Sequence, residues 1–149
     1  AMRIALAADH AGYELKDALG SWLKEAGHEV IDLGTNGPES VDYPQYGAQL
    51  AAAVAIGRAD RGIAVCGSGI GISIAVNREP KCRCARVDDP LSARLAREHN
   101  DANVLALGAR LIGQDMARAC VTAFLGTDFA GGRHSARVAQ LSNLLQDSD

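Results

Sequence analysis

The chain has 149 residues, of which 48% are hydrophobic, and a formal net charge of −3. This length predicts one domain over residues 1–149 that can bury a core without a metal or disulfide, and the apolar fraction excludes a disordered chain. The negative charge argues against a general nucleic-acid binder, so any anion site must be a local cluster of cations.

Short apolar runs alternate with helical patterns along the chain. The apolar runs predict strands at residues 3–8, 28–33, 62–66, 82–87 and 103–107. These runs are largely continuous, which is typical of a parallel sheet covered on both faces.

Helices are predicted between and after these strands. The first ends at Gly27, and its apolar face is made of Leu15, Leu19, Trp22, Leu23 and Ala26. The next three cover residues 43–56, a short stretch after a glycine turn at 67–71, and residues 90–99. In the fifth, the expected apolar face is Ile112, Met116, Cys120 and Phe124. An extra C-terminal helix follows Gly131-Gly132, with an apolar stripe of Val138, Leu141 and Leu145.

This alternation predicts an α/β fold with three layers, in which helices cover both faces of a doubly wound parallel sheet. Such folds bind ligands beside the carboxyl ends of their strands. The segments that follow those ends are polar, namely Asp9-His10, Cys66-Gly67-Ser68, Asp88-Asp89 and Gly108-Ala109-Arg110. We therefore expect a functional site at that edge of the sheet.

The most informative segment is Cys66-Gly67-Ser68-Gly69-Ile70-Gly71-Ile72-Ser73, a strand end followed by a glycine turn and a helix start. A helix N-terminus favours the anionic form of a nearby thiol. Glycines let backbone N–H groups point at a bound anion without obstruction. The segment therefore predicts a thiolate base or nucleophile beside an anion site.

Two other interpretations of the segment are weaker. A dinucleotide fingerprint needs glycine at position 72, which is Ile72, and the loop follows the third strand instead of the first. Asp88 lies about 20 residues further on, where a ribose-binding acid would stand, so this alternative stays open. There is no Gly-Lys-Ser/Thr and hence no P-loop. A plain tight turn is the remaining alternative.

Two histidines and one aspartate are further candidates. Asp9 and His10 follow the first strand directly, and two ionisable groups beside the glycine turn favour a site role over simple capping of the next helix. His99 ends the fourth helix, where the dipole favours imidazolium. The position of His99 alone does not separate a functional role from a helix cap.

Three arginines are candidates for an anion. Arg133 and Arg137 lie four residues apart on one face at a helix start, where their charges oppose the helix dipole unless an anion is bound. Paired guanidinium groups suit phosphate, and a solvated helix face is the alternative. Arg110 is the third candidate.

The other cysteines, Cys82, Cys84 and Cys120, are expected in the core. Cysteine spacing does not indicate disulfides, and no set of side chains has metal-ligand spacing, so we expect no metal. No apolar run is long enough for a membrane span, and no secretory signal opens the sequence. We expect a cytoplasmic protein with reduced thiols and neither nucleic-acid nor membrane partners.

The direction of the fourth helix separates His99 from Cys66. The helix leaves the carboxyl edge and runs back, so its end lies near the opposite edge, just before the strand at 103–107. A five-residue strand spans about 17 Å, so His99 cannot easily contact Cys66 of its own chain. A catalytic His99 therefore demands a second subunit.

Taken together, five segments resemble the ribose-5-phosphate isomerase B family, which also includes galactose-6-phosphate isomerase subunits. They are Ala8-Asp9-His10-Ala11-Gly12, Asp42-Tyr43-Pro44, the segment from Cys66 to Ser73, His99-Asn100-Asp101-Ala102-Asn103 and Gly131-Gly132-Arg133-His134. The likeness runs from Met2 to about Leu145, and Ser68 stands where threonine is common.

The resemblance implies a Rossmann-like domain with a five-stranded parallel sheet that interconverts ribose 5-phosphate and ribulose 5-phosphate through a cis-enediolate, without a cofactor. It makes Cys66 the base, assisted by His99, Asp9 and Ser68. The phosphate ligands that it implies are His10, Arg110, Arg133 and Arg137. The residues implied around the sugar and enediolate are Tyr43, Gly67, Gly69, Ile70, Gly71, Ser73 and Asn100. It also implies a homodimer with sites built from two subunits, with a tetramer as an alternative.

Two other functions stay open. The chain could isomerise another sugar phosphate, such as galactose 6-phosphate or a four-carbon sugar phosphate. It could instead be a binding module for a nucleotide or phosphorylated ligand, with no chemistry at Cys66.

Overall fold

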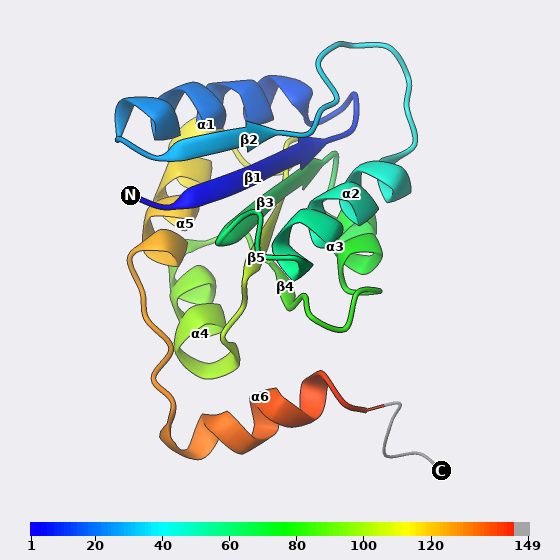
Figure 1. Cartoon of the computed structure of the whole chain (residues 1–149). Helices are drawn as coiled ribbons and strands as arrows, with labels where there is room; N and C mark the ends of the chain where they lie inside the picture. The colour runs from blue at the N-terminus through cyan, green and yellow to red at the C-terminus, as the bar shows by residue number, and fades with distance from the viewer. Residues whose placement is uncertain (145–149) are drawn as a thin grey trace.

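The structure, a computed structural model, describes residues 1–144 as five strands and a set of helices around them (Figure 1). In chain order these are β1 (Arg3–Ala8), α1 (Tyr13–Glu25), β2 (Glu29–Asp32), α2 (Tyr43–Ala55), β3 (Arg61–Cys66), α3 (Ile70–Val76), β4 (Cys84–Arg86), α4 (Pro90–Asn100), β5 (Val104–Gly108), α5 (Gln114–Leu125), the 3₁₀ turn η1 (Gly132–His134) and α6 (Ser135–Leu141). Each predicted strand and helix is present.

The five strands form one sheet in the order β2-β1-β3-β5-β4, and every neighbouring pair is parallel. The chain leaves β1 toward β2 on one side and leaves β3 toward β5 and β4 on the other. The carboxyl ends of β1 and β3 therefore flank the point where the winding direction reverses, which is where open α/β sheets bind ligands.

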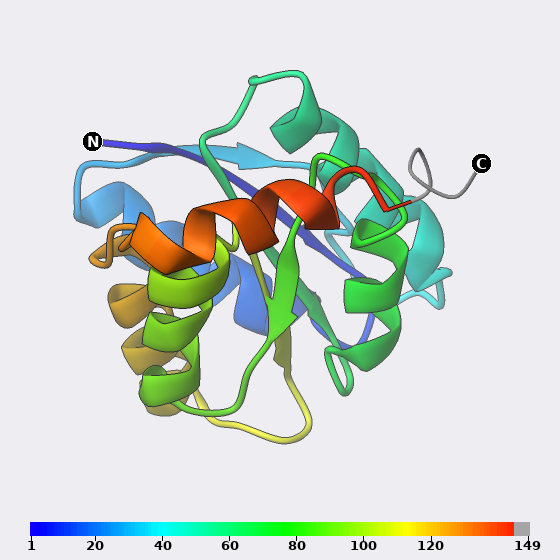
Figure 2. The same ribbon diagram turned by 90° about the horizontal axis from the view of Figure 1, so that it is seen from below.

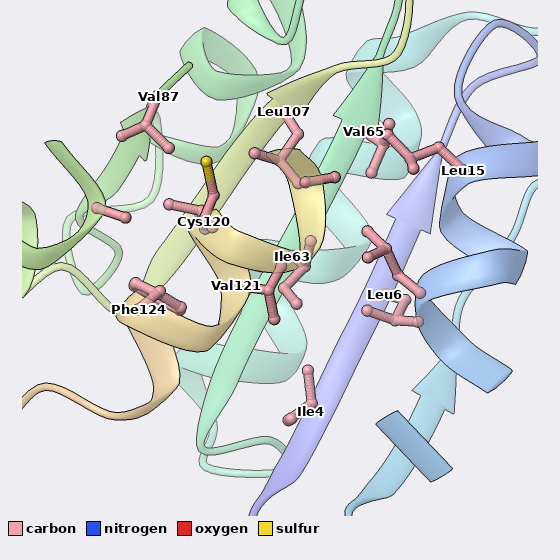
Figure 3. Close-up of a cluster of buried hydrophobic side chains, with 14 of the residues drawn as sticks. Ile4, Leu6, Leu15, Ile63, Val65, Val87, Leu107, Cys120, Val121 and Phe124 are labelled. Carbon is pink, nitrogen blue, oxygen red and sulfur yellow. The ribbon is translucent and has the colours of Figure 1, made fainter. Parts of the chain in front are cut away.

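Side chains that alternate along the strands enter two separate cores, so the predicted three-layer α/β fold is confirmed. One core joins β1, β3 and β5 to α1, α4 and α5, and its members include Leu6, Val65 and Phe124 (Figure 3). The other core joins the same strands to α2 and α3 and contains Cys66. The Cys66 side chain thus lies on the face that α2 and α3 cover.

A charged side chain is buried between β2 and α1. Lys16 is fully buried, and its Nζ lies 2.7 Å from Asp17, 2.8 Å from Asp32 and 3.0 Å from the Asn36 side-chain oxygen. A buried ammonium needs such partners because removal from water penalises the charge. Lys16 thereby ties the segment after β2 to the first helix.

The predicted strand at 82–87 is too long. Observed β4 has three residues, and its outer edge pairs with a side chain instead of another strand: Asn77 donates to the Cys84 carbonyl at 2.9 Å and accepts from the Cys84 N–H at 2.8 Å. Cys82 lies in the preceding turn, where its N–H donates to the Glu79 carbonyl. Cys82 and Cys120 are buried in the core as expected, whereas Cys84 is half-buried.

The expected apolar face of the fifth helix is partly wrong. Met116 is 42% exposed, and Ile112 precedes the first residue of α5. Residues spaced four apart drift by about 40° per step around a helix with 3.6 residues per turn. The buried face follows the helical period instead and is made of Ala117, Cys120, Val121 and Phe124.

The segment after Gly131 begins as the 3₁₀ turn η1 and continues as α6. Within α6, Val138 is half-buried and Leu141 is 47% exposed, so the predicted stripe has little cover from its own chain. Leu145, the third member of that stripe, lies outside the described residues. Between residues 1 and 144 no helix is long and apolar enough to cross a membrane.

The packing of α2 on α3 predicts the effect of one glycine substitution. Gly47→Ala should lower the free energy of unfolding, because an added Cβ would lie 2.9 Å from the Ala75 Cβ and 3.2 Å from the Ile72 carbonyl oxygen. Overpacking costs about 1–3 kcal/mol, which outweighs the gain of about 1 kcal/mol in helix propensity.

Urea unfolding measures this effect, and Gly20→Ala in α1 is the matched control. The Cβ added there would meet only the ends of two side chains, Leu6 at 3.1 Å and Val30 at 3.9 Å. Equal stability of the two variants would contradict the packing argument.

Candidate active site

A hollow of about 520 Å³ opens at the carboxyl edge of the sheet, between the ends of β1 and β3. We call it the Cys66 hollow. Its lining residues are Asp9, Tyr43, Cys66, Gly67, Ser68, Ile70, Gly71, Arg110 and Leu111. The structure therefore brings together residues from four separate segments of the predicted site.

The Cys66 thiol lies at the base of this hollow. It is 4% exposed, and its Sγ accepts a hydrogen bond from the Gly69 N–H at 3.1 Å. Gly69 has φ +76°, and a Cβ there would lie 2.8 Å from the Leu107 carbonyl carbon, so only glycine fits this turn. A backbone donor aimed at the sulfur stabilises negative charge on it.

Two side chains that line the hollow, those of Arg110 and Tyr43, lie directly against glycines. A Cβ at Gly67 would lie 3.2 Å from an Arg110 guanidinium nitrogen, and a Cβ at Gly71 would lie 2.6 Å from the Tyr43 ring. Backbone bonds from Ala109 and Arg110 to the carbonyls of Cys66 and Gly67 fix the segment after β5 against the glycine turn. The exposed Arg110 guanidinium is therefore held against Gly67, in the same hollow as the thiol.

Asp9 serves the turn after β1 and also faces the hollow. One carboxylate oxygen accepts hydrogen bonds from the Ala11 N–H at 3.0 Å and the Gly12 N–H at 3.1 Å. Asp9 is only 7% exposed, yet it lines the Cys66 hollow. The two sequence interpretations, a turn cap and a site residue, are both compatible with this geometry.

His10 carries a defined tautomer. Its Nδ1 accepts a hydrogen bond from the Val41 N–H at 3.2 Å. A neutral imidazole that accepts at Nδ1 carries its proton on Nε2. The Nε2–H of His10 can therefore donate to an anion.

The two predicted serines differ in availability. Ser68 lines the hollow, and its Oγ accepts from the Ile70 N–H at 3.1 Å, which leaves its own hydroxyl proton to donate. Ser73 is buried and donates to the Ile70 carbonyl at 2.7 Å. The Ser73 hydroxyl therefore serves α3 and is not part of the hollow's lining.

Arg86 is a residue that sequence reasoning missed. Its Nε donates to the Ser68 carbonyl at 3.0 Å, and its guanidinium pairs with Asp88 at 2.6 Å. The pattern of apolar runs in the sequence does not indicate that Arg86 bonds to the glycine turn. The pairing also engages Asp88, the acid that a dinucleotide site would need for ribose.

The remaining predicted site residues form a second set, which we call the His99 group: His99, Asn100, Arg133 and Arg137. None of them lines the Cys66 hollow. The His99 ring stacks on the His134 ring with 4.5 Å between centroids and 15° between planes. Desolvation, followed by the nearby charges of His99, Arg133 and Arg137, lowers the pKa of His134.

The cations of the His99 group are presented to solvent. Arg133 lies in η1 and Arg137 in the first turn of α6, so the predicted spacing of four holds although the helix begins as a 3₁₀ turn. Both are exposed, and the ion pairs found within residues 1–144 include neither of them. Figure 2 shows α6 running past the C-terminal end of α4.

Among residues 1–144, no cluster of three or more His, Cys, Asp or Glu side chains could hold a metal ion.

Known proteins resemble this chain over nearly its whole length. The family model described as Ribose/Galactose Isomerase matches residues 4–141. Ribose-5-phosphate isomerase B of Escherichia coli (strain K12) is 46% identical over 144 residues, 97% of each chain.

Solved structures agree over nearly the whole chain. Clostridium thermocellum ribose-5-phosphate isomerase B superposes with a TM-score of 0.97 and 48% identity, covering 99% of this chain and 100% of that one. The Mycoplasma genitalium ribose-5-phosphate isomerase B with bound ribulose-5-phosphate gives a TM-score of 0.93 and 34% identity, covering 98% and 97%.

The environments of the four thiols predict selective labelling. Burial raises the pKa of Cys82 to about 11 and that of Cys120 to about 11, and it also raises the pKa of Cys84. These groups stay protonated at pH 8, and only the thiolate reacts with iodoacetamide. Iodoacetamide at pH 8 should therefore modify Cys66 first, as peptide mass spectrometry can show.

Labelling of Cys82 and Cys120 should rise only as the pH approaches their raised pKa values. The Cys66→Ala variant is the control and should take up little label at pH 8. Modification of Cys120 ahead of Cys66 in the folded protein would contradict the assignment.

Proposed function

The chain belongs to the ribose/galactose isomerase family, and we propose that it interconverts ribose 5-phosphate and ribulose 5-phosphate. The observation that carries the proposal is the Cys66 thiol, buried at a strand end and bonded to a glycine N–H in a hollow that Asp9, Ser68 and Arg110 also line. The names of the relatives, one of them solved with ribulose-5-phosphate, support this substrate.

The chemistry is a proton transfer between adjacent carbons. The Cys66 thiolate removes the proton from C2 of the open-chain aldose, and the C2 electron pair forms the C1–C2 double bond of a cis-enediolate. The negative charge moves to O1. Cys66 then returns the proton to C1, and the proton on O2 passes to O1 as the C2 carbonyl forms.

The glycine turn stabilises the enediolate. Gly71 is the second residue of α3, where a backbone N–H has no acceptor within the helix. Such donors, fixed beside the developing oxyanion, stabilise the transition state without rearrangement. Gly67, Gly69 and Ile70 shape the same turn, and the Gly69 N–H is engaged by the sulfur.

Other residues prepare and hold the sugar. His99 acts as general acid and base in ring opening, with Asp9 and Ser68 assisting around the sugar. Tyr43 and Asn100 line the chain of the sugar, with Ser73 supporting α3 beneath it. His10, Arg110, Arg133 and Arg137 hold the phosphate, for which guanidinium forks and an Nε2–H donor are suited.

A homodimer with composite sites reconciles the two sets of residues. The Cys66 hollow and the His99 group do not meet within one chain, so each must face the other set on a second copy. Apolar side chains around the hollow are exposed and suit such a contact; they are Tyr43 at 40%, Ile70 at 50%, Leu111 at 57% and Ile74 at 60%. Since Cys66 acts only when reduced, we also propose that the enzyme works in the cytoplasm.

Removal of the thiol separates an isomerase from a binding module. Cys66→Ala should lower turnover of ribose 5-phosphate by about 10³-fold or more while sugar phosphate binding, measured by calorimetry, is retained. Wild-type turnover should be compared for ribose 5-phosphate, galactose 6-phosphate and a four-carbon sugar phosphate. Full activity in the variant would refute the role of Cys66, and faster turnover of another sugar would reassign the substrate.

Removal of one of the cations that hold the phosphate should chiefly weaken substrate binding. Arg137→Ala should raise KM for ribose 5-phosphate by an amount equivalent to about 1.5–3 kcal/mol, the contribution of one hydrogen bond to a charged group. The control is Arg58→Ala, an exposed arginine after α2, and its KM should stay at the wild-type value. Equal KM values for the two variants would contradict phosphate binding by Arg137.

Mixed dimers test the composite site. Cys66→Ala and His99→Asn chains, each inactive alone, should regain activity after unfolding and joint refolding, because a mixed dimer holds one intact site. Random pairing predicts about one quarter of the wild-type activity per chain. If mass spectrometry shows mixed dimers and no activity returns, the composite site is refuted.

A further inference from the structure

One buried arginine joins three segments at the amino ends of the strands. Arg97, in the last turn of α4, is 3% exposed. Its Nη1 donates to an Asp101 carboxylate oxygen at 2.7 Å and to the Ala102 carbonyl at 2.8 Å, and its Nε donates to the Thr127 carbonyl at 3.0 Å. Arginine is almost never buried so deeply without such partners.

Asp101 turns the chain immediately after His99 and Asn100. It has φ +48° and ψ +43°, and within residues 1–144 it is the one non-glycine residue with positive φ. Its carboxylate also contacts Arg83 Nη2 at 3.3 Å, while Arg83 Nε donates to its carbonyl at 2.8 Å. Two guanidinium groups therefore hold the turn that ends α4.

The same contacts hold the segment that leads to Arg133. The Thr127 carbonyl is bonded to Arg97, and the Ala130 N–H donates to the Glu98 carbonyl at 3.1 Å. The chain then turns through Gly131 and Gly132, with φ +66° and +55°, into η1. From there the His134 ring lies against the His99 ring.

A guanidinium suits this junction because its donors diverge in a fixed plane. Arg97 uses them on a side chain and two backbone carbonyls, which belong to the end of α4, the approach to β5 and the segment after α5. A lysine would offer one point charge on a flexible stem. Loss of the fork would free the two parts of the His99 group to move relative to each other.

We propose that Arg97 is a positioning residue, which fixes His99 relative to Arg133 and Arg137 through its contacts with Asp101, Ala102 and Thr127. The proposal rests on the proposed function, in which the His99 group completes the site of a second copy. Arg97 itself contacts neither the Cys66 hollow nor the sugar.

The test compares Arg97→Met with Arg94→Met. Arg94 lies on the same helix, is exposed and pairs with Glu98 at 3.5 Å. A misplacement of about 1 Å costs about 10²-fold in rate, so Arg97→Met should lower kcat/KM for ribose 5-phosphate by about that factor. Arg94→Met should stay within about twofold of wild type, since an exposed ion pair contributes little. Unchanged kcat/KM in Arg97→Met would overturn the proposal.

Mixed dimers show which part of the site is damaged. Arg97→Met mixed with Cys66→Ala should regain about a quarter of wild-type activity, because one site combines an intact hollow with an intact His99 group. Arg97→Met mixed with His99→Asn should regain none. Absence of recovery with Cys66→Ala, while Cys66→Ala recovers with His99→Asn, would mean that Arg97 supports the whole fold and would overturn a positioning role.

A spectroscopic measurement tests the role of Arg97 independently of the composite site. The stacked rings of His99 and His134 shift each other's imidazole proton resonances, and this shift should be lost in Arg97→Met and kept in Arg94→Met. Iodoacetamide labelling of Cys66 should keep its wild-type rate in both variants. If Arg97→Met keeps the ring shift, the proposal is overturned even where the dimer model holds. If the mixture of Cys66→Ala and His99→Asn regains no activity and the other results are as expected, only the composite site is overturned.

If Arg97→Met fails to fold, Asp101→Asn provides the same test. Asparagine tolerates the left-handed conformation but removes the carboxylate that Arg97 and Arg83 share. The expected results are the same loss of kcat/KM, the same ring-shift loss and the same mixing pattern. Wild-type values for all three would overturn the proposal.

Discussion

The architecture of the site depends on direct contact between the main chain of the glycine turn after β3 and the main chain at the end of β5. A Cβ at Gly69 would lie 2.8 Å from the Leu107 carbonyl carbon, and a Cβ at Gly108 would lie 2.6 Å from the Ser68 carbonyl oxygen. Only chains without side chains at these points can approach so closely. This contact fixes the turn, which in turn aims the Gly69 N–H at the Cys66 sulfur and holds Arg110 over Gly67.

The sheet face that carries the thiol, covered by α2 and α3, differs from the other face in the size of its strand side chains. The other core carries the larger side chains, such as Phe124, Leu105 and Leu107, whereas Ala5, Ala7, Ala64 and Ala106 line the face beside Cys66. Small side chains let α2 and α3 lie close to the sheet. The two faces of the sheet thus carry cores of different side-chain size, and the thiol lies on the face with the smaller strand side chains.

Local sequence patterns predicted most strands, helices and turns, because these elements depend on residues that are neighbours in the chain. The run before Cys66 and the glycines after it placed the thiol at a strand end, and Gly27 marked the end of α1. The direction of α4 separated His99 from the Cys66 hollow. Contacts between distant residues leave no periodic trace, so Lys16 with Asp32, Arg86 with Ser68, and Arg97 with Thr127 were missed. Met116 was misplaced because a spacing of four resembles a helical face over one turn and departs from it over three.

The side chain of Asn77 bears on how copies of this chain can associate. Open sheets often join through their outermost strands, whose free N–H and C=O groups can pair with another molecule. At β4 the Asn77 amide takes both groups of Cys84, in the way that a neighbouring strand would. A second sheet could continue through this strand only by displacing that amide. Edge-to-edge pairing at β4 therefore costs the two hydrogen bonds of this amide, which disfavours a continuous sheet between copies at this edge.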